Sequence, residues 1–129
     1  MNIRSVTQSD IDQVAPMHMN AWREAYRGIF PKPVLEQLKP KDFSEKWNSW
    51  LKEPLRVNWI AQFKDNFSGF ISFGNAEKTN IESSWEIFAL YIDPDSWGQG
   101  IGKSLMTSCM DFLKDKEIAQ VRLWVVRKI

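Results

Sequence analysis

Apolar and polar residues alternate briefly at the start of the chain and then change to a helical period. Residues 2–6 predict a short first strand. Thr7, followed three positions later by Asp10, is a typical helix start, with Thr7 as the N-cap and a carboxylate favourable in the first turn. A long amphipathic helix, kinked near Pro16, should then run to Gly28. Its expected apolar face comprises Ile11, Val14, Ala15, His18, Trp22, Ala25 and Tyr26.

The rest of the chain divides into runs with helical or strand-like patterns, separated by prolines, glycines and a short polar turn. In chain order the expected elements are helices over 30–40 and 42–54, strands over 55–63 and 67–75 joined by the turn Lys64-Asp65-Asn66, a strand over 83–94, a helix over 101–115 and a strand over 119–126. Strands joined by a hairpin argue against an all-parallel sheet. We therefore predict an α/β (α+β) fold, with a mixed, mostly antiparallel sheet flanked by helices.

Size and composition limit the class of protein. The chain has 129 residues, 43% hydrophobic and 26% charged, which fits one globular domain over 1–129. Its 17 basic and 16 acidic residues are interleaved and leave a net charge of +1, so neither nucleic acid nor a membrane surface is an expected partner. The N-terminus lacks a signal-peptide pattern, and no run is apolar enough to span a bilayer, so we expect a cytoplasmic protein.

The sequence contains few residues that could form a disulfide or bind a metal ion. Cys109 is the single cysteine and cannot form an internal disulfide. His18 is the single histidine, so no zinc-type cluster of histidines and cysteines exists. We expect no bound metal.

A glycine-rich stretch between the strand at 83–94 and the helix at 101–115 carries the main chemical signal. Gly102-Lys103-Ser104 suggests a nucleotide-binding P-loop, but the glycine required five residues before its Gly-Lys-Ser end is replaced by Trp97. The dinucleotide pattern G-x-G-x-x-G also fails, because Leu105 stands at its third glycine. Unpaired N–H groups at a helix N-terminus attract a diphosphate, and glycines allow close approach. We therefore predict a phosphate-bearing ligand.

These residues resemble the GCN5-related N-acetyltransferase (GNAT) family, whose cofactor turn has the form Gln/Arg-x-x-Gly-x-Gly/Ala. The stretch WGQGIG over 97–102 matches this form at Gly100 and Gly102 and departs from it at Trp97. Residues 86–106 resemble the fourth strand, turn and third helix of the family, and 18–31 resembles the first-helix segment of members that act on small amines. The resemblance implies an acyl-CoA N-acyltransferase-like fold.

The resemblance also implies acetyl-coenzyme A (acetyl-CoA) as the donor and an amine as the acceptor. The pantetheine arm would pair with the backbone of the fourth strand, and the diphosphate would meet N–H groups of the glycine turn. The alternative is an ordinary strand-to-helix connection. The expected cofactor-binding residues are Leu90, Tyr91, Ile92, Trp97, Gly98, Gln99, Gly100, Ile101, Gly102, Lys103 and Ser104.

Acetyl transfer requires a neutral amine and a donor to the thioester oxyanion. By resemblance, the oxyanion donor comes from the backbone of the fourth strand. Glu86, expected on the same side of that strand as Phe88, Leu90 and Ile92, is the candidate catalytic base, or else a solvated carboxylate. His18 is a second proton acceptor by residue type, but an apolar helix face favours a buried, satisfied histidine.

Aromatic residues are candidates for the acceptor pocket, because their faces suit amines and cations. Trp22, Tyr26 and Trp85 are the expected substrate-binding residues, with core packing as the alternative for each.

The family normally continues past its fifth strand with a helix and two more strands, which carry a tyrosine that protonates the thiolate. No residue of this sequence, which ends at Ile129, matches that segment. The fold is therefore expected to lack the last helix and two strands and to expose the edge of residues 121–126, which predicts a homodimer. The leading hypothesis is an acetyl-CoA-dependent N-acetyltransferase acting on a small molecule or peptide. The alternative is a catalytically weak coenzyme A-binding or assembly module of the same fold.

Overall fold

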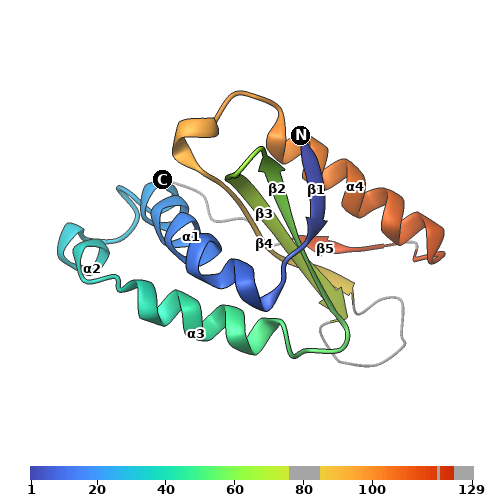
Figure 1. Ribbon diagram of the computed structural model, residues 1–129, viewed down its shortest axis with the longest axis horizontal. Helices are drawn as coiled ribbons and strands as arrows, with labels where there is room; N and C mark the ends of the chain where they lie inside the picture. The colour runs from blue at the N-terminus through green and yellow to red at the C-terminus, as the bar shows by residue number, and fades with distance from the viewer. Residues whose placement is uncertain (76–84, 119, 124–129) are drawn as a thin grey trace.

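A computed structural model describes residues 1–75, 85–118 and 120–123 of the chain. Five strands form one sheet in the order β1-β2-β3-β4-β5 (Figure 1). The first four pair antiparallel in sequence, and β5 pairs parallel to β4, so the predicted mixed, mostly antiparallel sheet is confirmed. The strands are β1 (Asn2–Ser5), β2 (Arg56–Phe63), β3 (Asn66–Asn75), β4 (Trp85–Ile92) and β5 (Arg122–Leu123).

Helices cover both faces of this sheet, as predicted. On one face lie α1 and α3, with the short α2 beside them, and α4 lies on the other (Figure 1). The helices are α1 (Ile11–Ala25), α2 (Lys32–Glu36), α3 (Pro40–Trp50) and α4 (Ile101–Asp115). A 3-10 turn precedes α1 (Gln8–Asp10), and the main chain of Thr7 donates to Asp10 Oδ2 at 2.7 Å, which confirms the predicted helix start.

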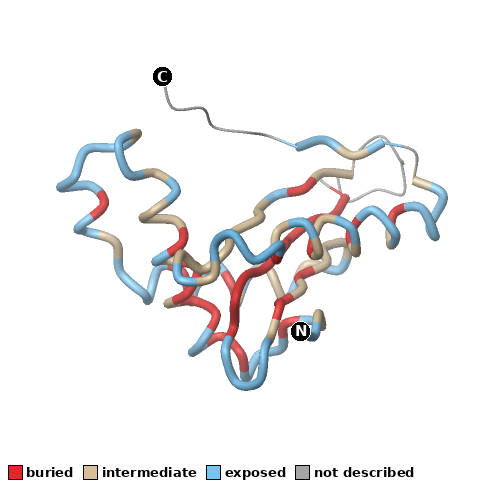
Figure 2. Tube along the Cα trace, turned by 90° about the horizontal axis from the view of Figure 1, so that it is seen from above, coloured by how far each residue is buried: buried red, intermediate tan, exposed pale blue. Residues whose placement is uncertain are grey.

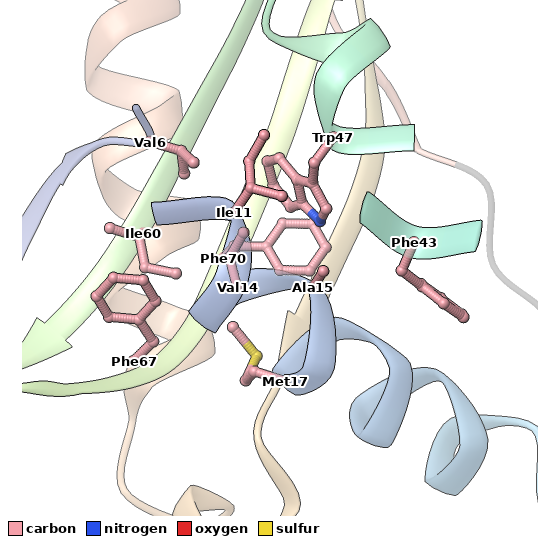
Figure 3. Packing of buried hydrophobic residues seen from close by; sticks show 10 residues of the cluster. All are labelled: Val6, Ile11, Val14, Ala15, Met17, Phe43, Trp47, Ile60, Phe67 and Phe70. Carbon is pink, nitrogen blue, oxygen red and sulfur yellow. The ribbon is translucent and has the colours of Figure 1, made fainter. Parts of the chain in front are cut away.

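The core on the α1 side is built from large aromatic and aliphatic side chains. Val14 of α1, Trp47 of α3 and Phe70 of β3 are fully buried and meet there (Figure 3). Alternate residues of β3, Ile71 and Phe73 among them, join the second core beneath α4 instead. Because β3 contributes to both cores, it is buried along nearly its whole length (Figure 2).

The predicted elements agree with the structure in order and type, but α1 ends at Ala25, before the expected Gly28, and α2 covers only Lys32–Glu36 of the helix expected over 30–40. The turn between β2 and β3 is tighter than expected, because Asn66 already belongs to β3 and Lys64 takes a positive φ of 56°. A 3-10 turn over Pro94–Ser96 follows β4 and was not predicted. Parts of the strands expected over 83–94 and 119–126 lie outside the described residues.

Candidate cofactor turn and acceptor face

The turn between β4 and α4 is shaped by two glycines in the left-handed region. Gly98 and Gly100 both have φ of +79°, a conformation that residues with a Cβ rarely adopt. Gly100 is the N-cap of α4, as the sequence pattern predicted. A Cβ built at either glycine would have no protein atom within 4 Å, so the turn faces open space.

Gly102 has a different explanation, because it lies inside the first turn of α4 with helical backbone. A Cβ there would meet only the Ile92 side chain at 3.7 Å, an ordinary van der Waals contact. A helical glycine costs about 0.5–1 kcal/mol relative to alanine. Neither the backbone conformation nor the protein's own packing therefore requires glycine here, whereas close approach of a ligand would.

The N-terminus of α4 has the properties of an anion site. No side chain of the described residues caps it, and no acidic residue lies in its first turn. The Ser104 main chain donates to Gly100 O at 3.0 Å, which leaves the preceding first-turn N–H groups to face the open side of the turn. Lys103 is exposed on the same turn. The arrangement fits the diphosphate that the sequence predicted.

Trp97 stands where the resemblance led us to expect glutamine or arginine. Its indole Nε1 donates to the carbonyl of Ile92 at 3.0 Å, which ties the turn back to the last residue of β4. The rest of the side chain is exposed, at 54% of its full accessible surface. Trp97 therefore both fastens the turn and presents an aromatic face to solvent beside it.

A β-bulge interrupts β4 and changes which side chains share a face. Ile87 pairs with Phe73 and Ala89 pairs with Ser72, so Phe88 is the extra residue. Before the bulge, Ile87 packs beneath α4, and Glu86 therefore points to the α1 face.

After the bulge the alternation is shifted by one residue. Leu90 and Ile92 pack beneath α4, whereas Tyr91 joins the α1 core. The expectation that Glu86 shares a face with Leu90 and Ile92 was wrong, because the extra residue reverses the alternation between them.

The Glu86 carboxylate is already engaged by a cation. Glu86 Oε1 lies 3.2 Å from Arg122 Nη2 of β5, and only 16% of its side chain is exposed. The two residues are also register partners at the described β4–β5 pairing. Arg122 contacts one of the two carboxylate oxygens, so the other oxygen can still accept a proton, directly or through water.

His18 is a buried residue of the aromatic core. Its side chain is 2% exposed, and Trp47 Nε1 donates to its Nδ1 at 3.1 Å. Burial, assisted by the positive charges of Lys46 and Arg56, lowers the pKa of His18 to about 3. The structure therefore supports the satisfied, buried interpretation of this histidine.

Two of the three predicted acceptor-wall residues lie together. The rings of Trp22 and Tyr26 have centroids 4.3 Å apart, and Tyr26 Oη lies 3.4 Å from Tyr91 Oη of β4. Phe30, which sequence reasoning missed, stacks on Trp22 at 5.5 Å. Trp85 packs beneath α4 instead, so the expectation of one wall containing all three residues was wrong. These three residues do not share a face because β4 directs Trp85 away from α1.

Other candidate chemistries are not supported by the described residues. Cys109 is buried in α4, and burial raises the pKa of its thiol to about 12, so it is not a ready nucleophile. No group of His, Cys, Asp and Glu in the described part of the chain could hold a metal ion. Among the same residues, no helix is long and apolar enough to cross a membrane.

Residues 19–128 match the sequence profile of the acetyltransferase (GNAT) family. The chain belongs to that family. It is 29% identical to an uncharacterized N-acetyltransferase, YuaI, of Bacillus subtilis, over 99% of this chain and 73% of that protein. It is 25% identical to the spermidine N(1)-acetyltransferase of Thermoplasma acidophilum, over 99% of this chain and 80% of that protein.

Solved structures agree with the fold. The crystal structure of PaiA N-acetyltransferase from Thermoplasma acidophilum in complex with coenzyme A matches with a TM-score of 0.84 at 22% identity, covering 98% of this chain and 80% of that one. The GNAT fold expected from the glycine turn and its flanking elements is therefore confirmed. Membership in this family also agrees with acetyl-CoA as the donor.

Proposed function

We propose that this GNAT protein transfers the acetyl group of acetyl-CoA to a primary amine of a small molecule or peptide. The observation that carries the proposal is the open turn at the N-terminus of α4, where Gly102 has no role in the protein's own packing. Acetyl-CoA supplies the reaction with an activated thioester.

The residues that would hold the coenzyme lie on the turn and on β4. N–H groups from Gln99 through Lys103 would receive the diphosphate, with Lys103 adding a positive charge, whereas the Ser104 N–H, also expected to bind it, already donates to the Gly100 carbonyl. The pantetheine arm would lie along the backbone of Leu90 to Ile92, which pairs with β3 on its other edge. Backbone N–H groups near the bulge would donate to the thioester carbonyl as negative charge develops on its oxygen.

The amine must lose a proton before it attacks, and Glu86 is the proposed acceptor, directly or through water. Glu86 lies on the α1 face, two positions before the bulge. Arg122 Nη2 lies 3.2 Å from Oε1 of this carboxylate.

The acceptor itself would lie against Trp22 and Tyr26 on the same face. Aromatic faces stabilise a protonated or partly desolvated amine. The spermidine N(1)-acetyltransferase relative supports the amine class of acceptor. Trp85 would contribute only through the core beneath α4.

A second candidate is a catalytically weak coenzyme A-binding or assembly module. It is favoured by one observation, the ion pair that already occupies the Glu86 carboxylate. Both candidates bind the coenzyme and differ only in turnover.

One assay distinguishes the enzyme from the module. The protein is incubated with acetyl-CoA and a panel of polyamines, aminoglycosides, amino acids and peptides, and the release of free thiol is measured. Amine-dependent thiol release is expected. Coenzyme A binding without thiol release for any amine of the panel would reject the enzyme hypothesis and support the coenzyme A-binding module.

A further inference from the structure

The guanidinium of Arg56 is held between two aromatic rings on the α1 face of the sheet. Its Cζ lies 4.0 Å from the ring centroid of Trp50 and 4.5 Å from that of Phe88. Only 10% of the Arg56 side chain is exposed. The planar cation therefore stacks against both rings in a largely desolvated position, where cation–π attraction is strong.

Polar contacts fix the orientation of this guanidinium. Arg56 Nε donates to Ser72 Oγ at 2.7 Å, and Ser72 Oγ donates in turn to Asn58 Oδ1 at 2.7 Å. Glu53 Oε2 lies 3.7 Å from Arg56 Nη1. Burial lowers the pKa of Arg56 to about 10, with Glu53 opposing the shift, so the side chain remains charged at neutral pH. Its plane is thus anchored on β2 and β3.

Phe88, one of the two aromatic residues that stack on Arg56, is the extra residue of the β4 bulge. An extra residue lacks a ladder partner, so the sheet alone does not determine its position. Its ring is 36% exposed and rests on Arg56. The described β4–β5 pairing covers Glu86 and Ile87, and Phe88 comes next.

We propose that Arg56 is a positioning residue for acetyl transfer, which acts by clamping Phe88 and so fixing the backbone of the β4 bulge. The inference rests on the proposed function, in which backbone N–H groups near the bulge stabilise the oxyanion. Donors of this kind must lie at about 2.7–3.1 Å from the developing oxyanion, and a misplacement of about 1 Å can cost roughly 100-fold in rate. Arg56 does not touch the reacting atoms.

Steady-state kinetics of Arg56→Lys, Phe88→Leu and the double variant test the clamp. Lysine keeps the charge but loses the flat stacking surface and the Nε contact, and leucine keeps an apolar residue at the bulge. Each single variant should lower kcat by roughly 10- to 100-fold, with the Kd for coenzyme A within about twofold of wild type. The double variant should be no slower than the worse single variant, because both changes break one contact.

Lys46→Met is the matched control, since Lys46 is exposed on α3, where its Nζ lies 5.2 Å from the centroid of the Phe43 ring, and takes part in none of the contacts described above for Arg56 and Phe88. It should retain kcat within about twofold. The proposal is overturned if Arg56→Lys keeps the wild-type kcat, if the two single effects multiply in the double variant, or if kcat and coenzyme A affinity fall together.

Amide spectra by NMR separate this inference from the proposed function. If wild-type protein released no thiol with any amine, the proposed function would fail. The contact between Arg56 and Phe88 would then be tested by the Phe88 and Ala89 amide signals alone. These signals should move in Arg56→Lys and stay in place in Lys46→Met. Unchanged signals in Arg56→Lys would reject the clamp as well.

Discussion

Gly102 illustrates how a single residue can separate a structural role from a binding role. Its backbone is helical, and alanine fits the local packing. Gly98 and Gly100 differ from it, because their positive φ already requires glycine in the absence of any ligand. Gly102 therefore gives the sharper test of why the turn is rich in glycine.

Gly102→Ala should stabilise the protein and weaken coenzyme binding at the same time. Removing a helical glycine should raise the free energy of unfolding by about 0.5–1 kcal/mol, measured by urea denaturation. If the diphosphate approaches the first turn of α4 as closely as proposed, the added methyl group should increase the Kd for coenzyme A, measured by calorimetry. Thr107→Ala, at an exposed position of α4, is the control and should leave that Kd unchanged. An unaltered Kd in Gly102→Ala would refute close approach at this residue.

His18 predicts how stability depends on pH. Its folded pKa of about 3 lies below the unfolded value of 6.5, so the unfolded chain binds the proton more readily. Stability should therefore be fully present above about pH 6.5 and fall as the pH is lowered toward 3. Between pH 7 and 5 the loss should be about 2 kcal/mol by urea denaturation. His18→Gln should flatten this dependence; a variant as pH-sensitive as wild type would show that another group is responsible.

At the scale of elements, the sequence predicted the helices and strands well and the faces of β4 poorly. The helix over 101–115 has a clear hydrophobic period, so the local pattern was enough to predict it. Residues 85–92 are apolar at nearly every position, so nothing in the pattern marks the extra residue at Phe88. For that reason the predicted face of Glu86 relative to Leu90 and Ile92 was wrong.

Contacts between residues far apart in the chain were also not predicted from the sequence. Arg56 lies within an ordinary strand pattern, and its partners Trp50 and Phe88 come from α3 and β4. Phe30 was expected at the start of the helix over 30–40, but it precedes α2 and lies in the connection from α1. Only the folded arrangement brings these side chains together.

The connection from β4 to α4 should depend on the Trp97 indole. Trp97→Phe removes the donor to the Ile92 carbonyl and keeps the aromatic ring. A lost, partly exposed hydrogen bond of this kind contributes about 0.5–1.5 kcal/mol, so the Kd for coenzyme A should rise severalfold by calorimetry, up to roughly tenfold. An affinity equal to wild type would show that the turn holds its shape without this bond.

Glu86 of β4 and its ion-pair partner Arg122 of β5 allow a test of the proposed catalytic base. Glu86→Gln should lower kcat by roughly 100-fold or more, the usual contribution of a general base, and leave coenzyme A binding intact. Arg122→Gln, which removes only the partner, is the comparison and should retain most of kcat. Equal rates for Glu86→Gln and wild type in the thiol-release assay would exclude Glu86 as the base.

At the scale of the whole molecule, the outer edge of the sheet bears on assembly. We propose a homodimer that covers the β5 edge, because Leu123 is 50% exposed on β5. Light scattering at micromolar concentration should give twice the chain mass of 15.1 kDa. Leu123→Lys should shift the protein toward the monomer by charging this edge. A wild-type monomer under the same conditions would rule out the dimer.

The central claim is that the N-terminus of α4 binds the diphosphate of coenzyme A. Calorimetric titration of coenzyme A into wild-type protein and Gly100→Glu tests it most directly. Glutamate at Gly100 adds a side chain and a negative charge to the open turn and requires a positive φ of 79°. Saturable binding by wild type and its loss in Gly100→Glu, with both proteins folded, is the predicted result. Equal affinity in the two proteins would contradict the account.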